Sequence, residues 1–108
     1  MGLVVSTESR AEGTVVRLQG DFDLHSSGEV RSTVDGLLVE GGGEVFLDLD
    51  GVDFLDSSGL GTLVGLQKRA NRARVRMVLC GLKPQMNKLL DITFLREAFT
   101  ILPEVPSG

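Results

Sequence analysis

The chain has few of the residues from which metal centres and nucleophilic active sites are usually built. Its 108 residues include one cysteine, Cys80, and one histidine, His25. A single cysteine excludes an intramolecular disulfide and a cysteine-based zinc cage, and the apolar run around Cys80 indicates a buried, inert thiol. A Ser-His-Asp triad would need His25, yet the run at 56–59 lacks the glycine that precedes the serine of a nucleophile elbow by two positions. We therefore expect a loop histidine without a catalytic role.

Long apolar runs and low-complexity tracts are also missing. No apolar run approaches the roughly 18 residues that cross a bilayer, and the N-terminus has no charged-then-apolar leader, so we expect a cytoplasmic protein without membrane contact. The net charge of −4 argues against a general nucleic-acid binder, whose affinity comes from neutralising phosphates. With no visible linker, the length suits one domain, 1–108, with an ordered core at about 3–102.

Apolar periodicity predicts an α/β fold. Alternating residues indicate strands at 3–7 and 14–19, joined by a Glu12-Gly13 turn into an antiparallel hairpin. The remaining pattern predicts strands at 44–50, 75–80 and 99–102 and helices at 26–40, at 58–71 and from Pro84. Since strands separated by helices pair in parallel, we expect a mixed sheet of four to five strands with three to four helices, antiparallel only at the N-terminal hairpin edge.

The helix at 26–40 has recognisable signals at both ends. Ser26 and Glu29 have the spacing of a capping box, in which each side chain bonds the other residue's backbone amide. Gly41-Gly42-Gly43 follows, and glycine adopts the left-handed conformation that closes a helix. We therefore expect the helix to begin at Ser26 and to end before Gly41.

Three segments are expected to lie outside regular structure. Gly51-Val52-Asp53 is interpreted as a turn, because a glycine interrupts the strand pattern. Phe94 and Leu95 are expected to pack under a loop. Residues 103–108 contain two prolines and are expected to form a frayed tail.

The segment 54–62 is the part of the chain most indicative of function. It places Asp56, two adjacent hydroxyls and two glycines between a strand and a helix. The first amides of a helix are unpaired and its dipole is positive there, so this turn can hold a negative group, including a phosphate added to a serine. The simpler alternative is that one serine caps the helix, a contribution of about 1 kcal/mol. Local physics does not choose between Ser57 and Ser58.

Three glycines, Gly59, Gly61 and Gly65, conflict with the helical pattern. Each costs about 1 kcal/mol relative to alanine inside a helix, and such conflicts occur at close-packed or functional sites. One explanation is tight packing of the helix on the sheet through Gly61 and Gly65. The other is a surface without side chains that lets another protein approach the serines. The two explanations are compatible.

Two charged clusters remain. The first consists of carboxylates that could form a magnesium site, namely Asp48, Asp50, Asp53 and Asp56. A nucleotide site would also need a phosphate-binding loop with a lysine, and Gly59-Leu60-Gly61 is too short for one. Five of the eleven basic residues fall within 68–76. We favour a solvated helix end for them over an acidic-partner site, because cations complement a helix C-terminus and no aromatic residues interleave.

Three runs of residues resemble the STAS family, and within it the single-domain bacterial anti-sigma factor antagonists. They are Gly20-Asp21-Phe22-Asp23, Phe46-Leu47-Asp48-Leu49 and Asp56-Ser57-Ser58-Gly59-Leu60-Gly61. The last run, in this context, is the specific one. The order of elements also agrees, so the resemblance extends from about Leu3 to Leu102.

The resemblance implies a partner-switching protein that is not an enzyme and needs no cofactor. The unphosphorylated form would bind an anti-sigma factor that is also a serine kinase, and so free the sigma factor. The kinase phosphorylates the serine directly after the aspartate, which here is Ser57, and a metal-dependent PP2C-type phosphatase reverses this. The resemblance also implies a phosphosite environment and partner-binding surface made of Asp23, Asp56, Ser58, Gly59, Leu60 and Gly61.

Two alternatives remain at this point. The chain could be a STAS binding module of a lipid-transport ATPase complex or of a stressosome scaffold, using the same turn for docking. It could also be an enzyme or nucleotide binder that uses the acidic strand ends. We expect no direct nucleic-acid or membrane contact, and the oligomeric state stays open between a monomer and a weak dimer.

Overall fold

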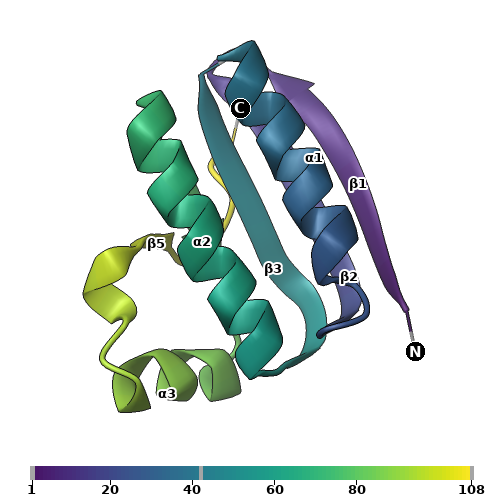
Figure 1. Cartoon of the computed structure of the whole chain (residues 1–108), viewed down its shortest axis with the longest axis vertical. Coiled ribbons are helices and arrows are strands. Elements are labelled where there is room, and N and C mark those ends of the chain that lie inside the picture. The colour runs from purple at the N-terminus through teal and green to yellow at the C-terminus, as the bar shows by residue number, and fades with distance from the viewer. Residues whose placement is uncertain (1, 42, 108) are drawn as a thin grey trace.

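The computed structural model describes residues 2–41 and 43–107. These residues form a five-stranded mixed sheet that is accompanied by helices (Figure 1). The strands lie in the order β1-β2-β3-β4-β5. β1 is antiparallel to β2, and each later neighbouring pair is parallel, which confirms the predicted sheet and its hairpin edge. The elements are β1 (Leu3–Arg10), β2 (Gly13–Phe22), α1 (Ser27–Glu40), β3 (Glu44–Leu55), α2 (Ser57–Ala73), β4 (Met77–Cys80), α3 (Pro84–Ile92), the 3-10 helix η1 (Arg96–Ala98) and β5 (Thr100–Leu102).

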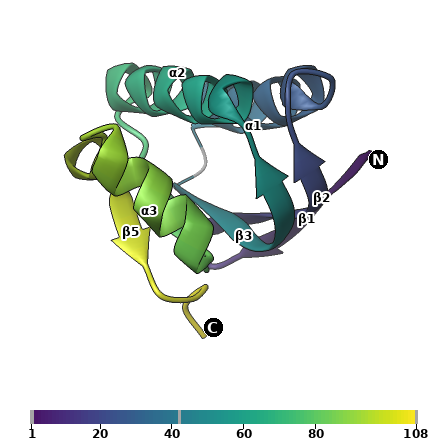
Figure 2. The same ribbon diagram turned by 90° about the horizontal axis from the view of Figure 1, so that it is seen from below.

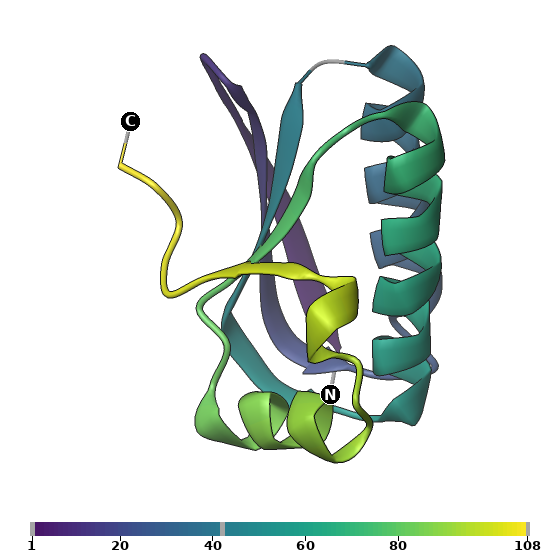
Figure 3. The ribbon, with the colours of Figure 1, turned by 90° about the vertical axis from the view of Figure 1, so that its left-hand side faces the viewer.

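The helices α1 and α2 lie side by side and cover one face of the sheet (Figures 2 and 3). Both belong to crossovers between parallel neighbours that step in the same direction, from β2 to β3 and from β3 to β4. A right-handed connection therefore places both on the same face. The helix α3 lies at the end of the sheet where α2 begins, and the C-terminal segment runs over the opposite face.

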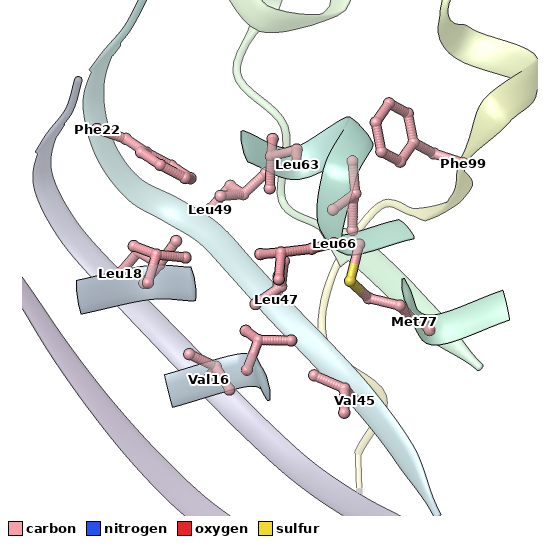
Figure 4. Packing of buried hydrophobic residues seen from close by; sticks show 14 of the residues in the cluster. Val16, Leu18, Phe22, Val45, Leu47, Leu49, Leu63, Leu66, Met77 and Phe99 are labelled. Carbon is pink, nitrogen blue, oxygen red and sulfur yellow. The ribbon is translucent and has the colours of Figure 1, made fainter. Parts of the chain in front are cut away.

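Period-two alternation sends the strand side chains to two separate apolar clusters. Val16 and Leu18 of β2 and Leu47 of β3 point toward the helices and meet Leu63 and Leu66 of α2 (Figure 4). The reverse face holds a second buried cluster of Val15, Phe46, Val78 and Cys80.

The C-terminal segment covers the second cluster. Leu102 and Val105 pack against it, and the Arg10 guanidinium donates a hydrogen bond to the carbonyl of Pro106. The prediction of a frayed tail is therefore wrong up to Pro106, because this segment shields the face of the sheet that α1 and α2 leave open. The last residue, Gly108, lies outside the described residues.

The start of α1 differs from the predicted capping box. Ser26 precedes the helix but has helical dihedrals (φ −98°, ψ −11°) and makes no side-chain cap. Its hydroxyl instead donates to the Asp21 carbonyl at 2.9 Å and accepts from the Asp23 amide at 3.0 Å. The Ser26 hydroxyl therefore accepts no hydrogen bond from the Glu29 amide, because it is engaged by the turn that precedes the helix. At the other end, Gly41 (φ 66°) closes the helix as predicted, while Gly42 lies outside the described residues.

The strand β3 continues through the glycine that was interpreted as a turn. A Cβ at Gly51 would lie 2.8 Å from Gln19 Cγ and 2.8 Å from the Leu18 carbonyl. Gly51 is therefore needed for close strand contact, and the β2–β3 register shifts nearby, between Arg17 and Gln19 and again between Gly20 and Asp21. Both strands consequently reach the same edge of the sheet, where Phe22 pairs with Leu55.

The loop after α3 separates two neighbouring apolar residues. Phe94 adopts a left-handed conformation (φ 58°), and the amide of Leu95 donates to the Leu90 carbonyl at 3.0 Å. This turn directs Leu95 against the core and leaves Phe94 91% exposed. The prediction that both residues pack under a loop is therefore wrong for Phe94.

Candidate functional site

The ends of β2 and β3 bring two acidic residues of the motifs to one edge of the sheet. Asp23 follows Phe22, and Asp56 follows its partner Leu55. The Asp56 amide also donates to the Phe22 carbonyl at 3.4 Å. The carboxyl ends of parallel strands are the usual place for binding sites in α/β sheets, and here they place the loop after β2 beside the first turn of α2.

Asp56, and neither serine, caps α2. Asp56 has extended dihedrals (φ −97°, ψ −176°), and its carboxylate Oδ1 accepts from the Gly59 amide at 2.8 Å. This is the geometry of an N-cap, which satisfies one of the helix's unpaired amides. The alternative in which a serine is present simply to cap the helix is therefore wrong, and α2 begins at Ser57, one residue earlier than predicted.

Ser57 and Ser58 are the first two residues of the helix. Ser57 is exposed, whereas Ser58 is half-buried. The Ser57 hydroxyl and both serine amides make no hydrogen bond to the described part of the chain, while the Asp56 amide, the Gly59 amide and the Leu60 amide are all bonded. A negative group on Ser57 would therefore meet free N–H donors at the positive end of a 17-residue helix.

Gly59 and Leu60 pack the first turn of α2 against the rest of the protein. A Cβ at Gly59 would lie 2.5 Å from the Phe22 carbonyl and 2.6 Å from Leu55 Cδ1, so only glycine fits between the helix and the strand ends. Leu60 is 5% exposed and belongs to the core. Gly59 and Leu60 were both expected in the partner-binding surface. In the structure they are buried, because they are the first residues on the inward face of α2.

Gly61 and Gly65 lie on the exposed side of α2. A Cβ at either position would meet nothing within 4 Å, so the prediction of tight packing through these two glycines is wrong. Instead they line an open groove of about 270 Å³ between α1 and α2. Ser58 of the motif lines the same groove, together with Arg31 of α1, a residue for which the sequence contains no local signal of a binding site. Its position follows only from the pairing of α1 with α2.

Asp23 lies beside the site but uses its carboxylate within its own loop. Oδ1 accepts from the His25 amide at 2.9 Å and from the Ser26 amide at 3.2 Å. This turn leads the chain from β2 into α1. His25 is exposed, and its backbone contact with Asp23 supports the expected loop role.

The other candidate chemistry is dispersed. Asp48 accepts from the Asp50 amide at 3.1 Å, Asp53 lies 3.5 Å from Lys83 Nζ, and Asp56 caps α2. In residues 2–41 and 43–107, no group of three histidine, cysteine or acidic side chains could hold a metal ion. Burial, with the nearby Asp48, raises the pKa of the Cys80 thiol to about 11, which fits the expected inert thiol.

The basic residues at 68–76 are divided between paired and unpaired side chains. Arg69 Nη1 lies 2.6 Å from Asp35 Oδ2 of α1, and Arg76 Nη1 lies 2.5 Å from Glu44 Oε2. Lys68, Arg72 and Arg74 are exposed and have no ion pair within the described ranges. None of the helices in those ranges is long and apolar enough to cross a membrane.

Comparison with known proteins gives a consistent result at three levels. The STAS domain model matches residues 4–107. The anti-sigma F factor antagonist of Paenibacillus polymyxa is 35% identical over 104 residues, which span 95% of this chain and 86% of that protein.

Two solved structures have the same fold. An anti-sigma factor antagonist from Mycobacterium paratuberculosis superposes with a TM-score of 0.85 at 18% identity, over 95% of this chain and 87% of that one. The Bacillus cell fate determinant SpoIIAA, in its phosphorylated form, gives 0.72 at 23% identity, over 94% and 93%. The family model and the 35% identical relative both span nearly the whole chain, and the chain belongs to the STAS domain family.

Proposed function

We propose that this protein is an anti-sigma factor antagonist that changes partners when Ser57 is phosphorylated. The observation that carries the proposal is the state of Ser57: an exposed hydroxyl at the first position of α2, with free amides beside it and with Asp56 already capping the helix. The relative from Paenibacillus polymyxa has the corresponding name. Phosphorylation in a protein of the same fold is stated for SpoIIAA.

In this mechanism the unphosphorylated chain binds an anti-sigma factor, which then releases its sigma factor. The anti-sigma factor is also the serine kinase, so it modifies the surface it binds. A PP2C-type phosphatase removes the phosphate. The chain is the substrate of these enzymes and has no catalytic role, and it acts in the cytoplasm without a cofactor.

The charge of the phosphate accounts for the loss of binding. Phosphorylation adds about −1.5 to −2 charges at pH 7 at a position that already has Asp56 and Asp23 nearby. Within the free protein the helix dipole and the free amides of the first turn offset this charge, so the fold survives. In a complex that covers the Ser57 hydroxyl, the same charge would be buried without a partner, at a cost of several kcal/mol. Since about 1.4 kcal/mol is a factor of ten in affinity, we expect a loss of roughly a hundredfold or more.

Accessibility supports Ser57 over Ser58 as the modified residue. A kinase active site must surround the acceptor hydroxyl, and Ser57 is exposed whereas Ser58 is half-buried. Ser58 faces the groove between α1 and α2. Ser58 then contributes to the surface that the partner contacts.

The proposal is tested by comparing Ser57→Ala and Ser57→Asp in a pull-down followed by titration calorimetry. Ser57→Ala should retain an anti-sigma factor kinase in the presence of ATP, and Ser57→Asp should bind the purified kinase at least about a hundredfold more weakly. Ser9→Asp is the matched control, because Ser9 is an exposed serine of β1 that pairs with Thr14, at the opposite end of β2 from the site. Capture of a transporter ATPase or of stressosome proteins instead of a kinase would contradict the proposal and favour one of the other STAS functions.

A further inference from the structure

The exposed groove between α1 and α2 has a composition that matches a particular kind of partner. Its α2 side is one stripe of the helix that begins at Ser58 and continues through Gly61 and Gly65 to Arg69. Arg31 forms the α1 side. The groove therefore starts at Ser58, next to the proposed phosphosite, and runs along the helical layer. Figure 2 shows this layer, formed by α1 and α2, on one side of the sheet.

This surface is positive although the protein as a whole is negative. The sequence of α2 contains no acidic residue, and its exposed charged side chains, Lys68, Arg69 and Arg72, are all basic. Arg69 reaches across to Asp35 at the far end of the groove. Arg31, Lys68 and Arg72 have no ion pair with any residue in 2–41 or 43–107, so their charges remain available to a ligand.

The two glycines have no structural requirement where they stand. A side chain at Gly61 or Gly65 would meet nothing within 4 Å, and glycine weakens a helix interior relative to alanine. Their effect is to keep the groove open, so that another chain can approach the helix closely between the arginines. A residue choice that opposes local preference without a packing reason is typical of a binding surface.

We propose that this groove binds an acidic segment of the anti-sigma factor, with its backbone over Gly61 and Gly65 and its carboxylates on Arg31 and the basic side chains of α2. This inference rests on the proposed function, because it assigns the partner's second area of contact. An acidic peptide segment fits better than DNA or an anionic lipid surface, because the basic side chains of the groove form a narrow strip and a chain with net charge −4 repels extended negative surfaces.

The groove also explains why a phosphate at Ser57 is an effective switch. The phosphate would sit at the groove's entrance, next to Ser58, and would meet the negative charge of the bound segment. Like charges placed at an interface oppose binding directly, in addition to the desolvation of the phosphate. Because exposed charges are screened by salt, binding of the unphosphorylated chain should weaken as the ionic strength rises.

The test uses the full chain and the purified anti-sigma factor obtained with Ser57→Ala. Gly65→Leu fills the groove, and Arg31→Glu reverses its charge. We expect both variants to bind at least about tenfold more weakly by calorimetry, and Arg31→Glu to reduce the dependence of affinity on salt between about 50 and 300 mM. Gly36→Leu is the matched control, because Gly36 is also an exposed glycine with an open Cβ position, on α1 and outside the groove. It should bind within roughly twofold of the unchanged protein.

The possible outcomes are distinguishable. Gly65→Leu should melt at the same or a higher temperature, so its weaker binding cannot come from unfolding. Normal binding by Gly65→Leu and Arg31→Glu, with Ser57→Asp still weak, would overturn this inference and leave the proposed function standing. If the unchanged chain binds no anti-sigma factor, both proposals fail. Binding to phosphatidylserine vesicles or to duplex DNA that Arg31→Glu abolishes would also overturn the acidic peptide as the ligand.

Discussion

Alanine in place of a glycine of α2 should raise or lower the free energy of unfolding, depending on the position. Gly61→Ala and Gly65→Ala should stabilise the protein, and Gly59→Ala should destabilise it. Gly61 and Gly65 are exposed and open, so alanine gains the helix preference of about 1 kcal/mol without a clash. Gly59 gains the same preference, but its new Cβ would lie 2.5 Å from the Phe22 carbonyl and 2.6 Å from Leu55 Cδ1. The leucine methyl can move, whereas the backbone carbonyl of a paired strand cannot move cheaply.

The expected sizes follow from these contacts. Overpacking of this kind costs about 1–3 kcal/mol and the displaced strand end adds to it, so we expect Gly59→Ala to lose about 1–2 kcal/mol after the helix gain. For a domain of this size, about 1 kcal/mol changes the melting temperature by roughly 4–8 °C. Gly61→Ala and Gly65→Ala should each melt higher by a similar interval.

Denaturant unfolding and thermal unfolding of the three single variants would measure these differences, with circular dichroism to check the helix content. The opposite signs are the decisive result, because the substitution, the helix and the helix preference are the same. A stabilised Gly59→Ala, or a destabilised Gly61→Ala and Gly65→Ala, would show that the close contact at Phe22 and the open groove are wrongly placed.

Three further results are expected. Asp56→Ala removes the N-cap of α2 and should cost about 1 kcal/mol in denaturant unfolding, while Asp56→Asn, which keeps an acceptor, should retain most of the stability; equal losses would refute the capping role. Phe94→Gly should raise the melting temperature, because Phe94 is 91% exposed and its left-handed conformation costs about 1–2 kcal/mol for a residue other than glycine; a fall would indicate that the ring packs on the protein. The Cys80 thiol, with its pKa raised to about 11 by burial, should not react with a maleimide at pH 8 until the protein unfolds, since the thiolate is the reactive form; rapid labelling of the native protein would contradict its burial.

Much of the fold follows from local pattern. Val16 and Leu18 face the helices while Val15 faces the other side, because successive strand residues point in opposite directions. Gly41 closes α1 in the expected left-handed conformation. These features depend on neighbours in the sequence, so a sequence pattern can predict them.

The differences arise where contacts between distant segments decide the structure. Gly51 lies inside β3, and glycine is required there because β2 approaches too closely for a side chain. The residues next to Gly51 in the sequence give no indication of that contact. Likewise, Gly59 is packed and Gly61 is open because of where the strand ends lie, although all three glycines of α2 look alike in the sequence. Arg31 joins the groove at Ser58 only through the packing of α1 on α2.

The identity of the candidate site was predictable, but the roles within it were less so. The run from Asp56 to Gly61 was identified from its residues and from its place before a helix. Assigning the cap to Asp56, and thereby leaving Ser57 without a structural role in the helix, required the three-dimensional contact between the Asp56 carboxylate and the Gly59 amide. Leu60 was expected among the partner-binding residues, yet it is 5% exposed and lies in the core, because it is the first large apolar residue on the inward face of α2.

The most direct test of the central claim is the position of the phosphate after incubation with the anti-sigma factor kinase and ATP. Mass spectrometry with fragmentation between the two serines can distinguish Ser57 from Ser58. We predict a single phosphate on Ser57 in the unchanged protein and none in Ser57→Ala. A phosphate on Ser58 alone, or full modification of Ser57→Ala, would contradict the account of Ser57 as the switch.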